Sequence, residues 1–162
     1  MAIVALGSNL AGRHGSSEAL LEAALARFPT AGLKILKRSS WWRAAAWPDP
    51  TAPEYRNGVA LVEATAEPGE MLAALLAIEA AEGRRRGERN APRTLDLDLI
   101  AHGRLVIRTP ALTLPHPRAH ERLFVMGPLA EIAGQWVHPT LGKTAAELAT
   151  KAVVGNDSRP VA

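Results

Sequence analysis

The segment LDLDLIA at residues 95–101 constrains the fold most, because aspartates alternate with leucines in a stretch that otherwise has the composition of a buried strand. Side chains at positions i and i+2 of a strand point to the same face, about 6.5 to 7 Å apart. Asp96 and Asp98 therefore project together, while the intervening leucines face a core. Two ionised carboxylates side by side repel each other unless a proton or a cation lies between them. The pattern predicts a strand with one apolar and one acidic face.

Arginines gathered just before this strand are a nearby source of positive charge. Arg84, Arg86, Arg89 and Arg93 fall in a segment with interspersed glycine and proline, which predicts a mobile loop. Guanidinium groups bind phosphate oxygens bidentately, and Mg²⁺ prefers carboxylate oxygens. The combination is the equipment of phosphoryl transfer, where two metal ions about 3.5 to 4 Å apart could share the aspartates. Simple Asp–Arg ion pairs would also satisfy the pattern.

Composition narrows the class of protein. The chain has 162 residues, which suits one domain, and 48% hydrophobic with 22% charged residues is ordinary for a globular protein. It has no cysteine, which excludes disulfides and thiolate metal sites and fits a reducing cytoplasm. We find no signal peptide and no apolar run of the roughly 20 residues that a membrane span needs. The net charge of +3 admits an anionic partner, although a mildly basic surface explains it equally well.

Hydrophobic periodicity predicts an α+β domain over residues 1–162. We expect strands at 2–6, 33–43, 56–64 and 95–101, a hairpin continuing into 104–107, and a proline-rich loop at 44–54. We expect helices from Ser16 or Ser17 to Pro29, from Pro68 onward, at 118–133 with a break near Gly127-Pro128, and at 143–151, followed by a flexible tail from about residue 153. The order β-α-β-β-α-β predicts a ferredoxin-like sandwich with extra C-terminal elements, whose antiparallel sheet lies under two helices and leaves its other face free for loops and a site.

Four segments together resemble the signature of the 6-hydroxymethyl-7,8-dihydropterin pyrophosphokinase family. They are ALGSNL (5–10), Tyr55-Arg56-Asn57, RNAPRTLDLDLI (89–100) and LTLPHPRAHERLFVMGPLAEI (112–132), which occur in the family's order. The resemblance implies transfer of diphosphate from ATP to the pterin hydroxymethyl group, giving the pterin diphosphate and AMP in folate biosynthesis. It also implies two Mg²⁺ ions, a cytoplasmic monomer, and no nucleic-acid or membrane partner.

The resemblance assigns roles on the nucleotide side residue by residue. Asp96 and Asp98 match metal-binding and catalytic aspartates, and Arg84 and Arg93 match catalytic arginines. A solvated rim charge or an arginine partner would explain Glu79 almost as well, and a rigid turn between two prolines would explain His116. The positions that match ATP-binding residues are Glu79, Arg86, Arg89, Arg93, Thr113, His116 and Arg122.

On the pterin side, the resemblance implies that Tyr55 and Phe124 sandwich the ring and that the Asn57 amide reads its donor and acceptor edge. Core packing for Phe124 and a turn at Asn57-Gly58 are the alternatives. Ala44 and Ala45 stand where many members carry Thr-Pro, so any contact there must come from the backbone. Trp47 lies in the same loop, where it would cover the site or anchor the loop. Asn90 stands where some members of the family carry Trp, and Pro117 where some carry Tyr, so neither position offers an aromatic ring to stack on adenine.

Two other functional classes fit parts of the sequence. An RNA-binding module would also use a ferredoxin-like sheet and arginine loops, but the aromatics are few and the aspartate pair would repel phosphates. Another Mg²⁺-dependent nucleotidyltransferase would release diphosphate rather than AMP. The nucleotide product therefore separates all three classes.

Overall fold

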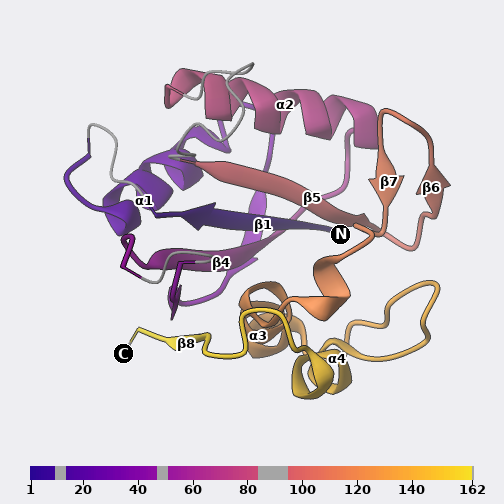
Figure 1. Cartoon of the computed structure of the whole chain (residues 1–162). Coiled ribbons are helices and arrows are strands. Elements are labelled where there is room, and N and C mark those ends of the chain that lie inside the picture. Colours follow the sequence, from indigo (N-terminus) through magenta and orange to yellow (C-terminus); the bar gives the residue numbers. More distant parts are fainter. Residues whose placement is uncertain (10–13, 47–50, 84–94, 162) are drawn as a thin grey trace.

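A six-stranded antiparallel sheet forms the centre of the structure, a computed structural model that describes residues 1–9, 14–46, 51–83 and 95–161. Its main path runs β5-β1-β4-β3-β8, and β2 also pairs with β4. Figure 1 shows this sheet between two layers of helices. The strands are β1 (Ala2–Ser8), β2 (Ile35–Arg38), β3 (Trp42–Ala44), β4 (Tyr55–Val62), β5 (Asp96–His102) and β8 (Arg159–Pro160). If β2 and β3 count as one interrupted strand, the predicted ferredoxin-like order is confirmed.

Helices α1 (Ser17–Arg27) and α2 (Pro68–Ala81) cover the first face of the sheet, as the periodicity predicted. The Ser16 hydroxyl caps α1 by accepting from the Ala19 N–H at 3.1 Å, and Pro68 occupies the first turn of α2. Both helices bury their apolar stripes against the leucines of β5 and the alternate residues of β1 and β4. The large side chains of this core include Leu20, Leu21, Phe28, Met71, Leu75, Ile78, Leu95, Leu97 and Leu99.

The second face carries α3 (Leu123–Ala133) and α4 (Ala145–Lys151), preceded by a 3-10 turn at Ala119–Glu121. They pack on a second apolar cluster that includes Ile3, Leu61 and Ile100. The expectation that this face would be free is therefore wrong for half of it. The other half, at the end of β1 that holds Gly7, remains for the site described below.

Two local predictions were wrong for reasons that pairing explains. The segment 33–43 is two strands, because the chain kinks at Ser39 and β2 and β3 each pair separately with β4. Ser39 fills the gap, since its N–H donates to the Val59 carbonyl and its hydroxyl accepts from the Val59 N–H, both at 2.9 Å. The hairpin does not involve β5. It joins β6 (Ile107–Arg108) to β7 (Thr113–Leu114) in a separate small sheet.

The C-terminal third differs most from expectation. Helix α3 runs through Pro128 rather than breaking there, and Gly127 packs so closely on Trp42 that a Cβ would lie 2.5 Å from the ring. This packing holds the helix although Pro128 lacks the N–H for its own ladder bond. The tail, expected to be flexible, contains the β8 strand and a bridge between Val154 and Arg122. Among the described residues, no helix is long and apolar enough to cross a membrane.

Candidate active site

The strand register aligns the polar residues of three strands in one row. Asp96 of β5 pairs with Gly7 of β1, which pairs on its other side with Asn57 of β4. Directly paired residues share a face of the sheet, so the carboxylate and the amide project to the same side. Two strand spacings, about 10 Å, separate their backbones. Asp98 lies on the same face, since it pairs with Ala5.

A cavity of about 960 Å³ opens over this row, within the size range of sites that enclose drug-sized ligands. Its floor is the uncovered half of the second sheet face, and its walls come from the start of α3 and from the C-terminal segment. Of the residues predicted for the site, the cavity is lined by Ala44, Ala45, Tyr55, Asn57, Asp96, Asp98, Arg122 and Phe124. These residues come from four separate parts of the sequence and meet in one place.

The two aspartates present the acidic face that the alternation predicted. Leu97 between them is only 3% exposed and packs into the first core, whereas Asp98 is exposed and Asp96 is half-buried. Within the described ranges, no group of three or more His, Asp or Glu residues gathers where it could hold a metal. A pair of carboxylates suits Mg²⁺, because this ion fills its remaining coordination positions with waters or substrate phosphates. The donor set therefore fits the expected metal.

The side-chain amide of Asn57 lies close against Gly7. This residue is 6% exposed, and its Oδ1 lies 2.9 Å from the position that a Cβ on Gly7 would occupy. Only glycine at position 7 leaves room for the amide beside the aspartate pair. The absence of a side chain at Gly7, the next-to-last residue of β1, is therefore explained by the position of Asn57 rather than by a turn.

The predicted aromatic pair both line the cavity. Tyr55 begins β4 opposite Ala44, and Phe124 lies in the first turn of α3. The Phe124 ring packs against Gly155, where a Cβ would lie 2.7 Å from Cδ1, and the Arg122 guanidinium lies 5.7 Å from the ring centroid. Phe124 is half-buried, so it serves both the second core and the cavity wall.

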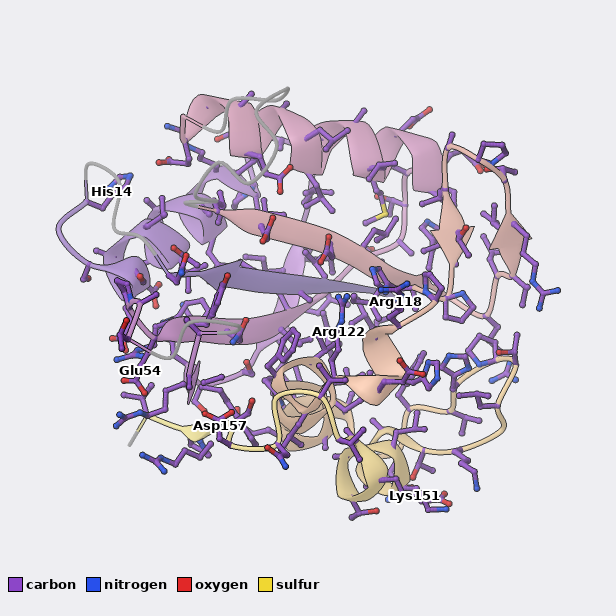
Figure 2. All side chains as sticks on the ribbon, in the orientation of Figure 1. His14, Glu54, Arg118, Arg122, Lys151 and Asp157 are labelled. Carbon is purple, nitrogen blue, oxygen red and sulfur yellow. The ribbon has the colours of Figure 1, made fainter. Side chains whose placement is uncertain are left out.

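Positive charge lies at the aspartate end of the cavity. Figure 2 shows Arg122 and Arg118 close to the right-hand ends of β1 and β5, above the turn that precedes α3. His116 lies beside them, and its backbone N–H donates to the Ile100 carbonyl at 2.8 Å. Burial lowers the pKa of the His116 imidazole; the nearby Asp98 carboxylate opposes this shift, while Arg122 and Arg118 add to it. The lowered pKa favours the neutral form of this imidazole, and the Asp98 carboxylate and the Arg122 guanidinium both lie close enough to affect it.

Thr113 and His116 do not line the main cavity. They line a second hollow of about 170 Å³, next to His120 and His138. Because the electrostatic contacts of His116 reach Asp98 and Arg122, this hollow adjoins the aspartate end of the site. The structure therefore separates the predicted ATP residues into a main cavity and a neighbouring niche.

Glu79 does not reach the cavity. Its side chain projects from α2 on the opposite face of the sheet, is 2% exposed, and accepts a hydrogen bond from the Leu97 N–H at 2.8 Å. That bond holds the outer edge of β5 at the residue between the two aspartates. The sequence offered a nucleotide contact, an arginine partner or a solvated rim charge for Glu79. Its burial rules out the solvated rim charge, and its bond to Leu97 supports the strand that carries the two aspartates.

The C-terminal segment Val153–Asp157 is a part of the site that the sequence did not predict. All five of its residues line the cavity. The segment has neither helical nor strand periodicity, and its sequence VVGND carries no motif, so no signal was present. Arg84, Arg86, Arg89, Arg93 and Trp47, predicted for the site, lie outside the described residues.

The fold and the cavity together define a small α+β domain whose cavity is lined by an acidic pair, a buried amide and two aromatic side chains. The family model for 7,8-dihydro-6-hydroxymethylpterin-pyrophosphokinase (HPPK) matches residues 3–134. The chain belongs to this family, whose members transfer the pyrophosphoryl group of ATP to hydroxymethyldihydropterin in folate synthesis.

Two of the three curated relatives that follow are named for this pyrophosphokinase activity. The chain is 43% identical over 148 residues to the 2-amino-4-hydroxy-6-hydroxymethyldihydropteridine pyrophosphokinase of Synechocystis sp., covering 91% of this chain and 73% of that protein. It is 34% identical to the enzyme of the same name from Methylorubrum extorquens, covering 88% and 92%. It is also 35% identical to the Folic acid synthesis protein fol1 of Pneumocystis carinii, covering 98% of this chain but 21% of that longer protein.

Solved structures support the fold. A crystal structure of a triple mutant of Plasmodium falciparum HPPK-DHPS superposes with a TM-score of 0.75 at 14% identity, covering 98% of this chain and 47% of that one. The wild-type protein gives a TM-score of 0.71, with 93% and 44% covered. The chain thus spans about half of these longer proteins, and its fold is that of their matching part.

Proposed function

We propose that the 960 Å³ cavity is where the chain transfers diphosphate from ATP to 6-hydroxymethyl-7,8-dihydropterin, with Asp96 and Asp98 at the phosphate end and Asn57 at the pterin end. The observation that supports this most is the shared row of β5, β1 and β4. It places an acidic pair and a buried amide on one sheet face, roughly two strand spacings apart.

Asp96 and Asp98 would hold Mg²⁺, in the expected number of two ions. When bound, the metal supplies positive charge that offsets the triphosphate and lowers the pKa of an oxygen nucleophile near it. The chain itself contributes rigidity. Leu97 is anchored in the core, and the Glu79 carboxylate fixes its N–H, so the two aspartates keep their spacing during turnover.

The nucleotide end is formed by cations and a neutral ring. Arg122 lines the cavity and presents a fork of donors that suits phosphate oxygens. His116, kept neutral by burial, can donate one hydrogen bond without adding a charge. With Thr113 it forms the adjoining niche, which we assign to the part of ATP beyond the phosphates. Arg84, Arg86, Arg89 and Arg93 keep their predicted phosphate roles.

The pterin end is formed by an amide between two aromatics. Tyr55 and Phe124 offer faces for offset stacking, and the amide of Asn57 offers both a donor and an acceptor to the ring edge. Backbone groups of Ala44 and Ala45 line the same end, because their side chains are too small to reach across it. Trp47 remains a predicted neighbour of this end.

In the proposed reaction the pterin hydroxymethyl oxygen attacks the β-phosphorus of ATP. A bond forms between that oxygen and the β-phosphorus, the bond from the β-phosphorus to the oxygen bridging to the α-phosphate breaks, and AMP leaves with that oxygen. The hydroxyl proton leaves to solvent. The side chains hold the two substrates in line, which is the main contribution of protein to phosphoryl transfer. We also propose that the chain works as a cytoplasmic monomer without nucleic acid.

Product analysis tests this function directly. The protein is incubated with ATP, Mg²⁺ and 6-hydroxymethyl-7,8-dihydropterin, and the nucleotides are separated by chromatography. We expect AMP to accumulate in equal amount to pterin diphosphate. Release of free diphosphate would identify a nucleotidyltransferase instead, and no pterin-dependent turnover would refute the proposal. An RNA-binding role is disfavoured because α3 and α4 cover half of the sheet face that RNA would use.

A further inference from the structure

The C-terminal segment Val153–Asp157 lines the substrate cavity although it lies beyond residues 3–134, the range that the family model matches. Val153 is 73% exposed and Val154 is 45% exposed, so this wall presents apolar surface at the cavity. Hydrogen bonds and packing fix this segment to the rest of the site at three places.

Its first tie is at the nucleotide end. The Leu123 N–H donates to the Val154 carbonyl at 2.9 Å, and the Val154 N–H donates to the Glu121 carbonyl at 3.0 Å. These two bonds form a bridge on either side of Arg122. The beginning of the segment is therefore fixed to the same turn that presents the arginine.

Its second tie is at the aromatic wall. Gly155 has φ of +68°, a conformation that side chains rarely adopt, and its Cα faces the Phe124 ring. The chain can turn across the ring only because residue 155 is glycine. Ser158 closes this turn, since its N–H donates to the Gly155 carbonyl at 2.9 Å.

Its third tie is at the pterin end. The Ala45 N–H donates to Asp157 Oδ2 at 2.8 Å, although the two residues are 112 positions apart in the sequence. Ala45 directly follows β3, whose last residue pairs with Tyr55. A proline at position 45 would have no N–H to donate, so this contact requires a residue other than proline there.

We propose that Asp157 is a positioning residue for the pterin: through the Ala45 N–H it fixes the wall that faces Tyr55 and so sets the width of the pterin end. The inference deepens the proposed function and rests on it. Asp157 acts through Ala45 and contacts no reacting atom. The bond between them joins the two chain segments, 44–46 and 153–157, that flank this end.

Steady-state kinetics of Asp157→Ala tests the proposal. We expect the KM for the pterin to rise about fivefold, the effect of one modest hydrogen bond, while kcat and the KM for ATP stay within about twofold of wild type. Asp157→Asn keeps an acceptor oxygen and should restore the KM for the pterin to within about twofold of the wild-type value. Glu63→Ala, which removes an exposed carboxylate beyond the far end of β4, is the matched control and should change none of these constants.

A double-mutant cycle isolates the contact itself. Ala45→Pro removes the donor, so adding Asp157→Ala to it should raise the KM for the pterin no further. Fluorescence titration of the pterin in the presence of a non-hydrolysable ATP analogue should give the same ratios as dissociation constants. Thermal melting of each variant accompanies the kinetics.

The outcomes are separable from failure of the proposed function. If wild-type protein releases no AMP with the pterin, the function itself is wrong. If wild type is active and Asp157→Ala keeps a wild-type KM for the pterin, the inference is overturned. Equal rises in both KM values with a lower melting temperature, or additive effects in the cycle, would show a merely structural contact and would overturn it as well.

Discussion

The amide of Asn57 occupies the space that a side chain on Gly7 would need: its Oδ1 lies 2.9 Å from an ideal Cβ at that position. The side chain of one residue of this pair thus fills the space that is left by the missing side chain of the other. The position of the Asn57 amide therefore requires glycine at residue 7, and this relationship can be tested without changing Asn57 itself.

Gly7→Ala should displace the Asn57 side chain and raise the KM for the pterin by about tenfold, equivalent to losing about 1.4 kcal/mol of binding. The KM for ATP should change much less, because the added methyl group lies at the pterin side of the row. Gly69→Ala is the control, since a Cβ there meets nothing within 4 Å. An unchanged pterin KM in Gly7→Ala would show that the amide does not read the pterin.

Asp98→Ala should abolish turnover while leaving the protein folded. The side chain is exposed, so its removal leaves no cavity and no buried unpaired group. We expect loss of AMP formation with a melting temperature within a few degrees of wild type. Chelation of Mg²⁺ should have the same effect on wild type, reversed by excess Mg²⁺. Glu67→Ala serves as the exposed-carboxylate control, and near-normal turnover by Asp98→Ala would refute the metal role.

Glu79→Ala should destabilise the protein by about 1–3 kcal/mol, because the Leu97 N–H loses its buried acceptor. Denaturation by urea measures this loss against Glu70→Ala, an exposed change on the same helix. We expect kcat to fall as well, since Leu97 holds the two aspartates apart. If stability is unchanged and only the KM for ATP rises, Glu79 contacts the nucleotide as the family resemblance implied.

The stability of the protein should fall as the pH drops below about 6.5, the usual pKa of histidine. Burial lowers the pKa of His138 below its usual value of 6.5, and the neighbouring His120 adds to this shift. As the pH falls, His138 therefore takes up a proton in the unfolded chain before it does so in the folded protein. The stability that comes from the neutral ring is complete above pH 6.5 and is lost as the pH falls toward the pKa of the folded protein. His116 shifts in the same direction, also mainly through burial.

The variant His138→Gln identifies the source of this pH dependence. The His138 Nδ1 accepts from the N–H groups of Thr140 and Leu141 at 3.2 Å, which a protonated ring could not do. Urea denaturation at several pH values should show a flatter profile in the variant. The glutamates with lowered pKa values, Glu22, Glu82, Glu131 and Glu147, lose their contributions only below about pH 4.5, so they do not interfere. An unchanged slope would assign the effect to another group.

The sequence predicted those parts of the fold whose signals are local. The cap at Ser16, the proline that begins α2 and the alternation around Leu97 each act within a few residues, and each element begins where its signal lies. The strand break at Ser39 could not be predicted in this way, because it depends on bonds to Val59 from a distant strand.

For the site, the sequence predicted residues with distinctive chemistry and missed those that act by shape or backbone. Asp96, Asn57 and Phe124 belong to conspicuous motifs and meet in the cavity. The roles of Gly7 and Asp157 depend on which strand or loop lies opposite, which only the tertiary register reveals. Glu79 was placed on the correct helix, but its partner on β5 could not be inferred.

The pairing of β8 with β3 has a practical consequence for attaching anything to this protein. Because β8 runs antiparallel to β3 and the Val161 N–H donates to the Trp41 carbonyl, a tag, fluorophore or fused domain added after it would start on the side away from Ala44 and Ala45. The amino end of β1 is about 20 Å from Gly7, at the opposite end of the same strand. Handles for immobilisation therefore belong after β8, because the amino end of β1 lies beside the niche of Thr113 and His116.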